Sequence, residues 1–340
     1  MPVPWPAAWK GTDFSDDSSW IYHLPQTALH EIEAALVAIR SRGPVQEMNK
    51  TDFPLPSIAS DLADLLNEVK QGRGFVLIRG LPVEKYSITD VETIYRGIGS
   101  HFGRVQSQND RGELMQEIKD IGHAYGATNV RGSRTKANME YHSDLATDIV
   151  ALLCVRKAKS GGVSGIASSM AIYNEFLQNY PPEYLERLYT GFSYDLRGVE
   201  RPGEAPVTVP IPVFSYYDGY LSCTYAHNPI VQAAKKIGKP FTDFENEVLN
   251  SFNEVTSRND MQLKMDLLPG EIQLLNNHTV LHRRTAFEDY EEPERKRLML
   301  RLWLTPPDPR PLPPEAINPC GQIASKRLGH PDKSRMRDAG

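Results

Sequence analysis

Short runs of branched and aromatic residues, each bounded by Gly, Pro, Asp or Asn, dominate the second half of this chain. They cover residues 149–155, 165–170, 213–217, 220–225, 272–276 and 297–304. Runs of this length and composition are typical of β-strands, and many short strands separated by turn signals favour an all-β sandwich or barrel. Asp218 and Gly219 stand between two of these runs and predict a two-residue hairpin turn.

Helices are expected beside these strands. Residues 27–42 and 57–70 carry apolar side chains at helical spacing, and Ser57 is a candidate N-cap. Further helices are predicted over residues 89–101, 171–188 and 243–257. The glycine-bounded apolar run at 74–80 predicts a buried strand. The sequence therefore predicts a mainly β fold with flanking helices.

The remaining segments predict how the chain is organised. Residues 105–135 are polar and rich in glycine, which favours a loop region over a pocket. Residues 1–25 resemble an extended N-terminal arm, and residues 306–340 form a Pro-rich tail. No internal repeat interrupts the pattern, so we expect one domain over residues 1–340 with its core at about 74–304.

Composition excludes several kinds of partner. The 340 residues carry a net charge of −5, so no general basic field is available for nucleic acid. No apolar run is long enough to cross a membrane, and the N-terminus lacks the pattern of a signal peptide. The three cysteines, Cys154, Cys223 and Cys320, are odd in number and widely spaced. A disulfide framework is not expected, and the reducing cytoplasm is the predicted location.

The motif His142-Ser143-Asp144 indicates a chemistry. Residues two apart on a strand point to the same side, so the imidazole of His142 and the carboxylate of Asp144 share one face. A His-x-Asp pair alone is a weak signal, because such pairs arise by chance. With His282, 140 residues later, it gives the two-histidine, one-carboxylate ligand set of non-haem Fe(II) oxygenases. His278 is the alternative second histidine, and is otherwise expected in a turn or at the surface.

The chain resembles the taurine dioxygenase-like (TauD/TfdA) superfamily of Fe(II)/2-oxoglutarate-dependent oxygenases, and is similar to its clavaminate synthase-type members. The resemblance rests on the order and spacing of five segments. They are GFVLIRGL at 74–81, RGSRTKANMEYHSD at 131–144, GGVS at 161–164, PGEIQLLNNxxxLHxRxxF at 269–287, and KRLMLRLWL at 296–304.

This resemblance implies a double-stranded β-helix core, which is jelly-roll and cupin-like, with helices packed outside. The strand pattern described above agrees with that fold. The resemblance also implies that His142, Asp144 and His282 are the catalytic iron ligands. The implied cofactor is Fe(II), and the implied co-substrates are 2-oxoglutarate and O₂.

Two arginines and a serine match co-substrate residues of the family. Arg297 matches the arginine that binds the distal carboxylate of 2-oxoglutarate, a role that suits a planar guanidinium. Ser164 stands where relatives commonly place a threonine hydroxyl near that carboxylate. Arg301 matches a second arginine that contacts substrate or co-substrate in several relatives. Since residues four apart on a strand share a face, both arginines would point into the barrel and need anionic partners.

Substrate contacts are predicted from the 105–135 loop region and from the second arginine. Gln108, Arg131 and Arg301 are the candidates, and such groups suit a small molecule with a carboxylate. We expect oxidation of an unactivated C–H bond, by hydroxylation, desaturation or cyclisation, in specialised-metabolite biosynthesis. The sequence does not indicate the oligomeric state.

Three other functions fit parts of the pattern. One is a catabolic dioxygenase that cleaves a sulfonate or an ether. A second is a non-catalytic jelly-roll protein that only binds metal, although the full ligand set and Arg297 argue against decay. A third is a zinc hydrolase, which would need a positioned general base and would have no use for Arg297.

Overall fold

The computed structural model describes residues 1–43, 47–109, 112–123, 132–144, 147–198, 203 and 205–314. Its larger sheet has seven strands, with the order β1-β2-β12-β6-β15-β3 and with β4 also paired to β15. These strands are β1 (Ile21–His23), β2 (Phe75–Arg79), β3 (Arg104–Val105), β4 (Met115–Ile118), β6 (Ile149–Arg156), β12 (Ile272–Asn276) and β15 (Leu298–Thr305).

A four-stranded sheet with the order β11-β8-β13-β5 faces the larger one. Its strands are β5 (Met139–His142), β8 (Ser164–Ser168), β11 (Gln262–Met265) and β13 (Val280–Arg284). Two further pairs are β9 (Phe214–Tyr217) with β10 (Tyr220–Cys223), and β7 (Ser160–Gly161) with β14 (Phe287–Glu288). In the described part of the chain no strand pairing joins the two main sheets, so they form an open double-stranded β-helix and not a closed barrel.

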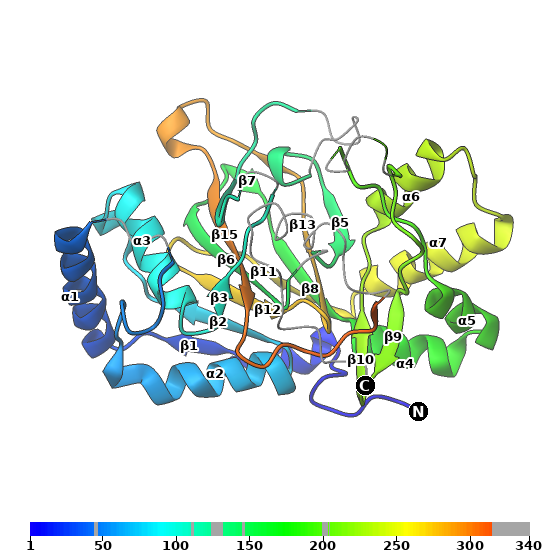
Figure 1. Cartoon of the computed structure of the whole chain (residues 1–340), viewed down its shortest axis with the longest axis horizontal. Helices are drawn as coiled ribbons and strands as arrows, with labels where there is room; N and C mark the ends of the chain where they lie inside the picture. The colour runs from blue at the N-terminus through cyan, green and yellow to red at the C-terminus, as the bar shows by residue number, and fades with distance from the viewer. Residues whose placement is uncertain are drawn as a thin grey trace.

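Helices cover the outer faces of both sheets (Figure 1). The larger sheet carries α1 (Gln26–Arg42), α2 (Ala59–Gln71) and α3 (Ile88–Gly99). Beside the smaller sheet lie α4 (Ser169–Asn179), α5 (Pro182–Thr190), α6 (His227–Lys236) and α7 (Asp243–Ser257). The predicted fold class, mainly β with flanking helices, is confirmed. None of the described helices is both long and apolar enough to cross a bilayer.

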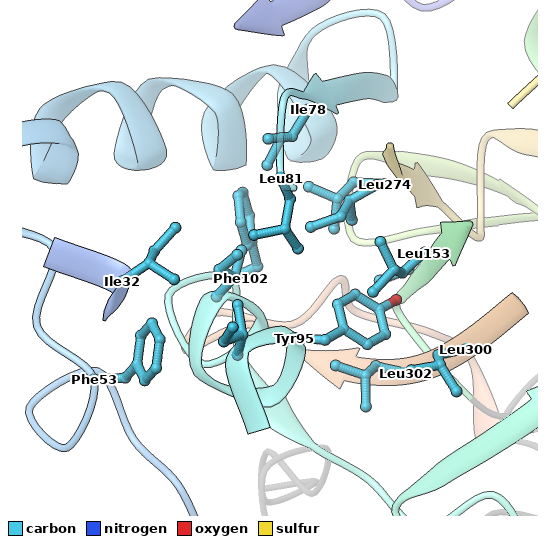
Figure 2. Packing of buried hydrophobic residues seen from close by; sticks show 14 of the residues in the cluster. Ile32, Phe53, Ile78, Leu81, Tyr95, Phe102, Leu153, Leu274, Leu300 and Leu302 are labelled. Atoms are coloured by element: carbon cyan, nitrogen blue, oxygen red, sulfur yellow. The ribbon is translucent and has the colours of Figure 1, made fainter. Parts of the chain in front are cut away.

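Alternation along β15 separates the two apolar layers. Leu300 and Leu302 pack outward with Leu153, Leu274 and helix residue Tyr95 (Figure 2). Met299 and Trp303 belong to the cluster between the sheets. Because successive strand residues point to opposite faces, Arg301 lies on the inner face with Trp303. The sheet thus places a charged side chain between the two sheets.

Several predicted elements match closely, and others need correction. The strand at 272–276, the helix at 243–257 and the 217–220 hairpin are confirmed; Asp218 and Gly219 adopt positive φ values of 48° and 82°. The helix expected at 171–188 is two helices. It breaks at Pro181-Pro182, where proline removes backbone N–H donors and restricts the residue before it.

The predicted N-cap at Ser57 is wrong. Helix α2 begins after Ile58, and the Ser57 hydroxyl donates instead to Glu31 Oε2 at 2.9 Å. The expected strand at 165–170 ends at Ser168, whose hydroxyl accepts the N–H of Ala171 at 3.0 Å and caps α4. The elements β4, β11 and α6 were not expected from the sequence.

The N-terminal arm is more than an extended segment. It contains a 3₁₀ turn at Gly11–Phe14 and the strand β1, which pairs in parallel with β2. Trp9 is fully buried, and its ring centroid lies 5.0 Å from that of Phe75. The Trp9 indole N–H donates to the carbonyl of Arg73 at 2.7 Å. The arm therefore supplies part of the core between the sheets.

Candidate metal centre

Two neighbouring strands bring the predicted ligands together. His282 on β13 is in register with His142 at the end of β5, and their ring centroids are 4.3 Å apart. Asp144 follows two residues after His142. One ligand atom from each of the three residues lies within 4.8 Å of the others. The structure therefore assembles the predicted triad from segments far apart in the sequence.

Both histidines can offer a neutral ring nitrogen to a metal. The Nδ1 atom of His142 donates to the carbonyl of Glu140 at 2.8 Å, which fixes the tautomer and leaves Nε2 as an acceptor. The Nδ1 atom of His282 is buried and has no hydrogen-bond partner among the described residues. Burial lowers the pKa of both, to about 3 for His282. At neutral pH both rings are therefore neutral, as metal ligation requires.

Asp144 is held as a carboxylate by N–H donors. Arg301 Nη1 donates to both oxygens, at 3.1 Å to Oδ1 and 3.0 Å to Oδ2, and Trp303 Nε1 donates to Oδ2 at 2.8 Å. Burial by itself would raise the pKa of Asp144, but Arg301, the two histidine ligands and the Trp303 N–H together lower it to about 2. The carboxylate is therefore ionised across the physiological range.

Arg301 is engaged at all three guanidinium nitrogens. Besides its contact with Asp144, Nε donates to Gln108 Oε1 at 2.8 Å and Nη2 donates to Gln116 Oε1 at 2.9 Å. Gln108 is 2% exposed, and its amide donates to the Arg301 carbonyl at 2.7 Å. Thus Gln108 and Arg301, two of the predicted substrate contacts, lie in a buried network behind the Asp144 carboxylate.

The backbone around Asp144 is fixed from both sides. Ser143 N donates to the carbonyl of Tyr225 at 2.7 Å, and Tyr225 N donates back to Ser143 Oγ at 3.0 Å. On the other side, Asp144 N donates to Asn277 Oδ1 at 2.8 Å, and Asn277 Nδ2 donates to the carbonyl of Thr147 at 2.9 Å. These bonds orient the ligand-bearing loop before any metal binds.

Arg297 is a buried cation with an unsatisfied donor. It is 7% exposed, its Nη1 atom has no hydrogen-bond partner among the described residues, and no ion pair found there includes it. Its guanidinium carbon lies 5.1 Å from the ring centroid of Phe287. A Cβ on Gly162 would come within 3.3 Å of Arg297 Nε, at a backbone φ of 72° that favours glycine. Burial lowers the pKa of this guanidinium.

Ser164 lies on the inner face of β8 and is 8% exposed. Its hydroxyl accepts a hydrogen bond from Gln273 Nε2 at 3.4 Å. Gly162, two residues before it, is the position where an added Cβ would approach Arg297. Ser164 therefore follows closely, along the chain, a glycine that lies near Arg297. Ser164 and Arg297 are the two residues predicted to bind one carboxylate.

Two other sequence candidates are His278 and Arg131. His278 lies in the turn after β12, one of the two expected positions, and is buried there; its Nε2 lies 3.0 Å from Asp148 Oδ1. It is not in the ligand cluster, which favours His282 as the second histidine. Arg131 lies outside the described residues.

Sequence reasoning missed several residues that support the centre. Trp303 shares a strand face with Arg301, so alternation along β15 could have revealed it. Gln116 accepts a hydrogen bond from Arg301, and Asn277 accepts one from Asp144 N. No spacing rule connects either residue to His142. Arg197, in the left-handed region at a φ of 55°, adds a positive charge that contributes to the lowered pKa of His142.

Comparison with known proteins identifies the family. The model of the "Taurine catabolism dioxygenase TauD, TfdA family" matches residues 40–303. The chain belongs to this family. Among its relatives, FR-33289 synthase of Streptomyces rubellomurinus is 33% identical over 317 residues, which is 92% of this chain and 93% of that protein. Taurine hydroxylase-like protein SAT17 of Stachybotrys chartarum is 26% identical over 326 residues, or 88% and 81% of the two chains.

Solved structures show the same fold at low identity. Asparagine oxygenase with Fe(II), 3-hydroxyasparagine and succinate has a TM-score of 0.63 at 15% identity, over 84% of this chain and 93% of that one. The non-haem iron oxygenase OrfP with Fe and α-ketoglutaric acid has a TM-score of 0.58 at 12% identity, with the same coverage. As a TauD/TfdA family member, the chain is an Fe(II)/2-oxoglutarate-dependent dioxygenase that uses O₂ and acts on small molecules.

Proposed function

We propose that this dioxygenase oxidises an unactivated C–H bond of a small carboxylate-bearing molecule in specialised-metabolite biosynthesis. Hydroxylation, desaturation and cyclisation are the outcomes open to such a site. The observation that carries the proposal is the triad of His142, Asp144 and His282 together with the buried Arg297, whose Nη1 donor has no hydrogen-bond partner in the described structure.

In this proposal His142, Asp144 and His282 hold Fe(II). The donor set fits, since two neutral imidazoles and an ionised carboxylate are the ligands of Fe(II) sites with open positions. Bound Fe(II) with 2-oxoglutarate supplies oxygen activation. The protein residues hold the ligands in place, keep both imidazoles unprotonated and exclude water.

Arg297 and Ser164 are proposed to bind the distal carboxylate of 2-oxoglutarate. Leaving a buried charged donor unpaired is costly, and Arg297 Nη1 has no hydrogen-bond partner in the described structure. A dicarboxylate would supply the missing charge with charge-assisted hydrogen bonds.

Arg301 and Gln108 are proposed to position Asp144, because Arg301 donates hydrogen bonds to both Gln108 and that carboxylate. For the primary substrate, Arg131 stays a proposed contact. Arg197, whose charge acts on His142, is a second cation suited to a carboxylate.

A sulfonate is the second candidate substrate. The name of the relative SAT17, taurine hydroxylase-like, favours it, and a sulfonate would use the same cations. We further propose that residues 1–340 form one catalytic domain that works in the cytoplasm. The thiols of Cys154 and Cys223 are buried and free, as a reducing compartment permits.

The test is conversion of 2-oxoglutarate to succinate and CO₂ by the Fe(II)-loaded enzyme in air, with panels of small carboxylates and sulfonates. We expect turnover that a carboxylate accelerates, and none in His142→Ala. Acceleration by sulfonates alone would favour the second candidate. Absence of any 2-oxoglutarate turnover with either panel would contradict the proposed function.

A further inference from the structure

Gln273 is a buried amide in an apolar layer. It lies on β12, in register with Leu77 of β2 and Leu152 of β6, and is 1% exposed. Its strand neighbours Ile272 and Leu274 pack outward against the helices, so Gln273 points into the space between the sheets. There it reaches the opposite sheet, where Nε2 contacts Ser164 Oγ at 3.4 Å and Met265 Sδ at 2.9 Å.

This amide is poorly placed for a purely structural role. Its Oε1 atom is buried and has no hydrogen-bond partner in the described part of the chain. An unpaired buried acceptor costs about 1–3 kcal/mol, whereas a leucine of similar shape would match the neighbours Leu77 and Leu152. A residue that lowers the stability of the fold at the centre of a sheet indicates a role in the functional site.

The contact with Ser164 determines what the serine hydroxyl can do. A hydroxyl has one donor hydrogen and two acceptor lone pairs. Because Gln273 Nε2 occupies an acceptor position on Ser164 Oγ, the single hydroxyl hydrogen is left for another acceptor.

The unpaired donor of Arg297 lies in the same region. Ser164 is in register with Arg284, and the guanidinium carbons of Arg284 and Arg297 lie 4.7 and 5.1 Å from the ring centroid of Phe287. Ser164 and Arg297 are therefore linked through Arg284 and Phe287, and in the proposed function one carboxylate accepts from both the Ser164 hydroxyl and Arg297 Nη1.

We propose that Gln273 is a positioning residue for the co-substrate, whose amide orients the Ser164 hydroxyl so that it donates to the carboxylate bound by Arg297. This inference rests on the proposed function, since it takes Ser164 and Arg297 as the distal carboxylate site. In this role Gln273 favours binding of a 2-oxo acid that carries a second carboxylate over one that lacks it.

The test compares two 2-oxo acids in the anaerobic Fe(II)-loaded enzyme. 2-Oxoglutarate carries the distal carboxylate, and 2-oxobutanoate has the same keto acid without it. Calorimetry gives the Kd of each. For Gln273→Leu we expect about threefold to tenfold weaker binding of 2-oxoglutarate, the size of one ordinary hydrogen bond. Binding of 2-oxobutanoate should not change, and thermal stability should be retained or raised.

A double-mutant cycle and a matched glutamine sharpen the test. In a Ser164→Ala background, Gln273→Leu should cause no further loss, because the hydroxyl that it orients is absent. Gln262 on β11 is also buried, but it bonds to Tyr141 and Arg283 on the other side of its sheet. Gln262→Leu should lower stability and leave the Kd of 2-oxoglutarate unchanged.

The possible results separate this inference from the proposed function. If the wild type does not bind 2-oxoglutarate, the proposed function fails and this inference fails with it. If the wild type binds it and Gln273→Leu binds it equally well, or loses both 2-oxo acids alike, only the role of Gln273 is overturned. Should Gln273→Leu fail to fold, Gln273→Met, which keeps the length of the side chain, gives the same comparison.

Discussion

At the scale of single residues, the contacts of Asp144 show how the protein holds a carboxylate that we propose as a metal ligand. Arg301 and Trp303 direct three N–H···O contacts at its two oxygens, and the side chains of Asp144 and Arg301 are each 9% exposed. These bonds restrict the carboxylate to one orientation. Contacts of this kind to metal ligands commonly affect metal affinity about tenfold to a hundredfold.

Trp303→Phe tests this arrangement. It removes the N–H that donates to Asp144 while keeping an aromatic ring beside Arg301, whose guanidinium carbon lies 4.8 Å from the indole. We expect metal affinity to fall about tenfold, measured by titration with Mn(II). Trp20→Phe is the control, since that indole donates to the carbonyl of Asp17. Unchanged affinity in Trp303→Phe would mean that this bond does not orient the ligand.

The buried thiols give a second prediction at this scale. Burial raises the pKa of Cys154 and of Cys223 to about 12, so thiolate is scarce at pH 8 and neither should react with iodoacetamide until the chain unfolds. Between pH 9 and 12 the unfolded chain loses thiol protons that the folded chain keeps, so stability should fall as pH rises. Mass spectrometry of the alkylated peptides measures the first effect. Rapid labelling of either peptide in the native protein would contradict it.

At the scale of elements, the turn between β12 and β13 connects the metal centre to the rest of the fold. Two adjacent buried asparagines stand where β12 ends and this turn begins, and their side chains bond to different parts of the fold. Asn277 bonds to the backbone of Asp144 and Thr147, whereas Asn276 Nδ2 donates to the carbonyl of Val69 in α2 at 3.1 Å. Asn277 therefore holds the backbone near Asp144, and Asn276 holds helix α2.

Asn277→Ala and Asn276→Ala form a matched pair. Both should lower the free energy of unfolding by about 1–3 kcal/mol, because each leaves buried backbone groups without partners. Asn277→Ala alone should also weaken metal binding about tenfold or more. Urea unfolding and Mn(II) titration of both variants measure the two effects. Equal metal affinity in the two variants would refute the separation of roles.

Elements with strong periodicity could be predicted from the sequence. Residues 243–257 and 272–276 match because apolar spacing alone determines them. Strand β11 and helix α6 were missed, since the strand is short with little alternation and Pro229 stands near the start of the helix. The metal triad followed from spacing and family resemblance. The contacts of Arg301 could not be predicted, because Gln108 and Gln116 approach it from a segment that the sequence marks only as loop.

At the scale of the whole molecule, the N-terminal arm holds the two sheets together. Trp9 and Phe14 pack in the cluster between the sheets with Phe75 of β2 and Met265 of β11. The arm also reaches α4, where Val3 N donates to Asn174 Oδ1 at 2.7 Å. A segment that the sequence predicts only as an extended arm thus contributes to the core that supports the site.

Trp9→Ala should therefore destabilise the fold strongly. Deleting a fully buried indole leaves a cavity, and we expect a loss of about 3–5 kcal/mol in the free energy of unfolding. Trp5→Ala is the control, because Trp5 is 61% exposed and should change stability by about 0.5 kcal/mol or less. Equal effects of the two substitutions in urea unfolding would show that the arm is not part of the core.

The most direct measurement is anaerobic titration of the protein with Fe(II) and 2-oxoglutarate, followed by the weak visible charge-transfer band of the chelate. The wild type should show the band, His142→Ala and His282→Ala should lose it, and Arg297→Ala should need far more 2-oxoglutarate to form it. A wild type without the band, or a band that survives loss of both histidines, would contradict the assignment of this centre as the site of Fe(II) and 2-oxoglutarate.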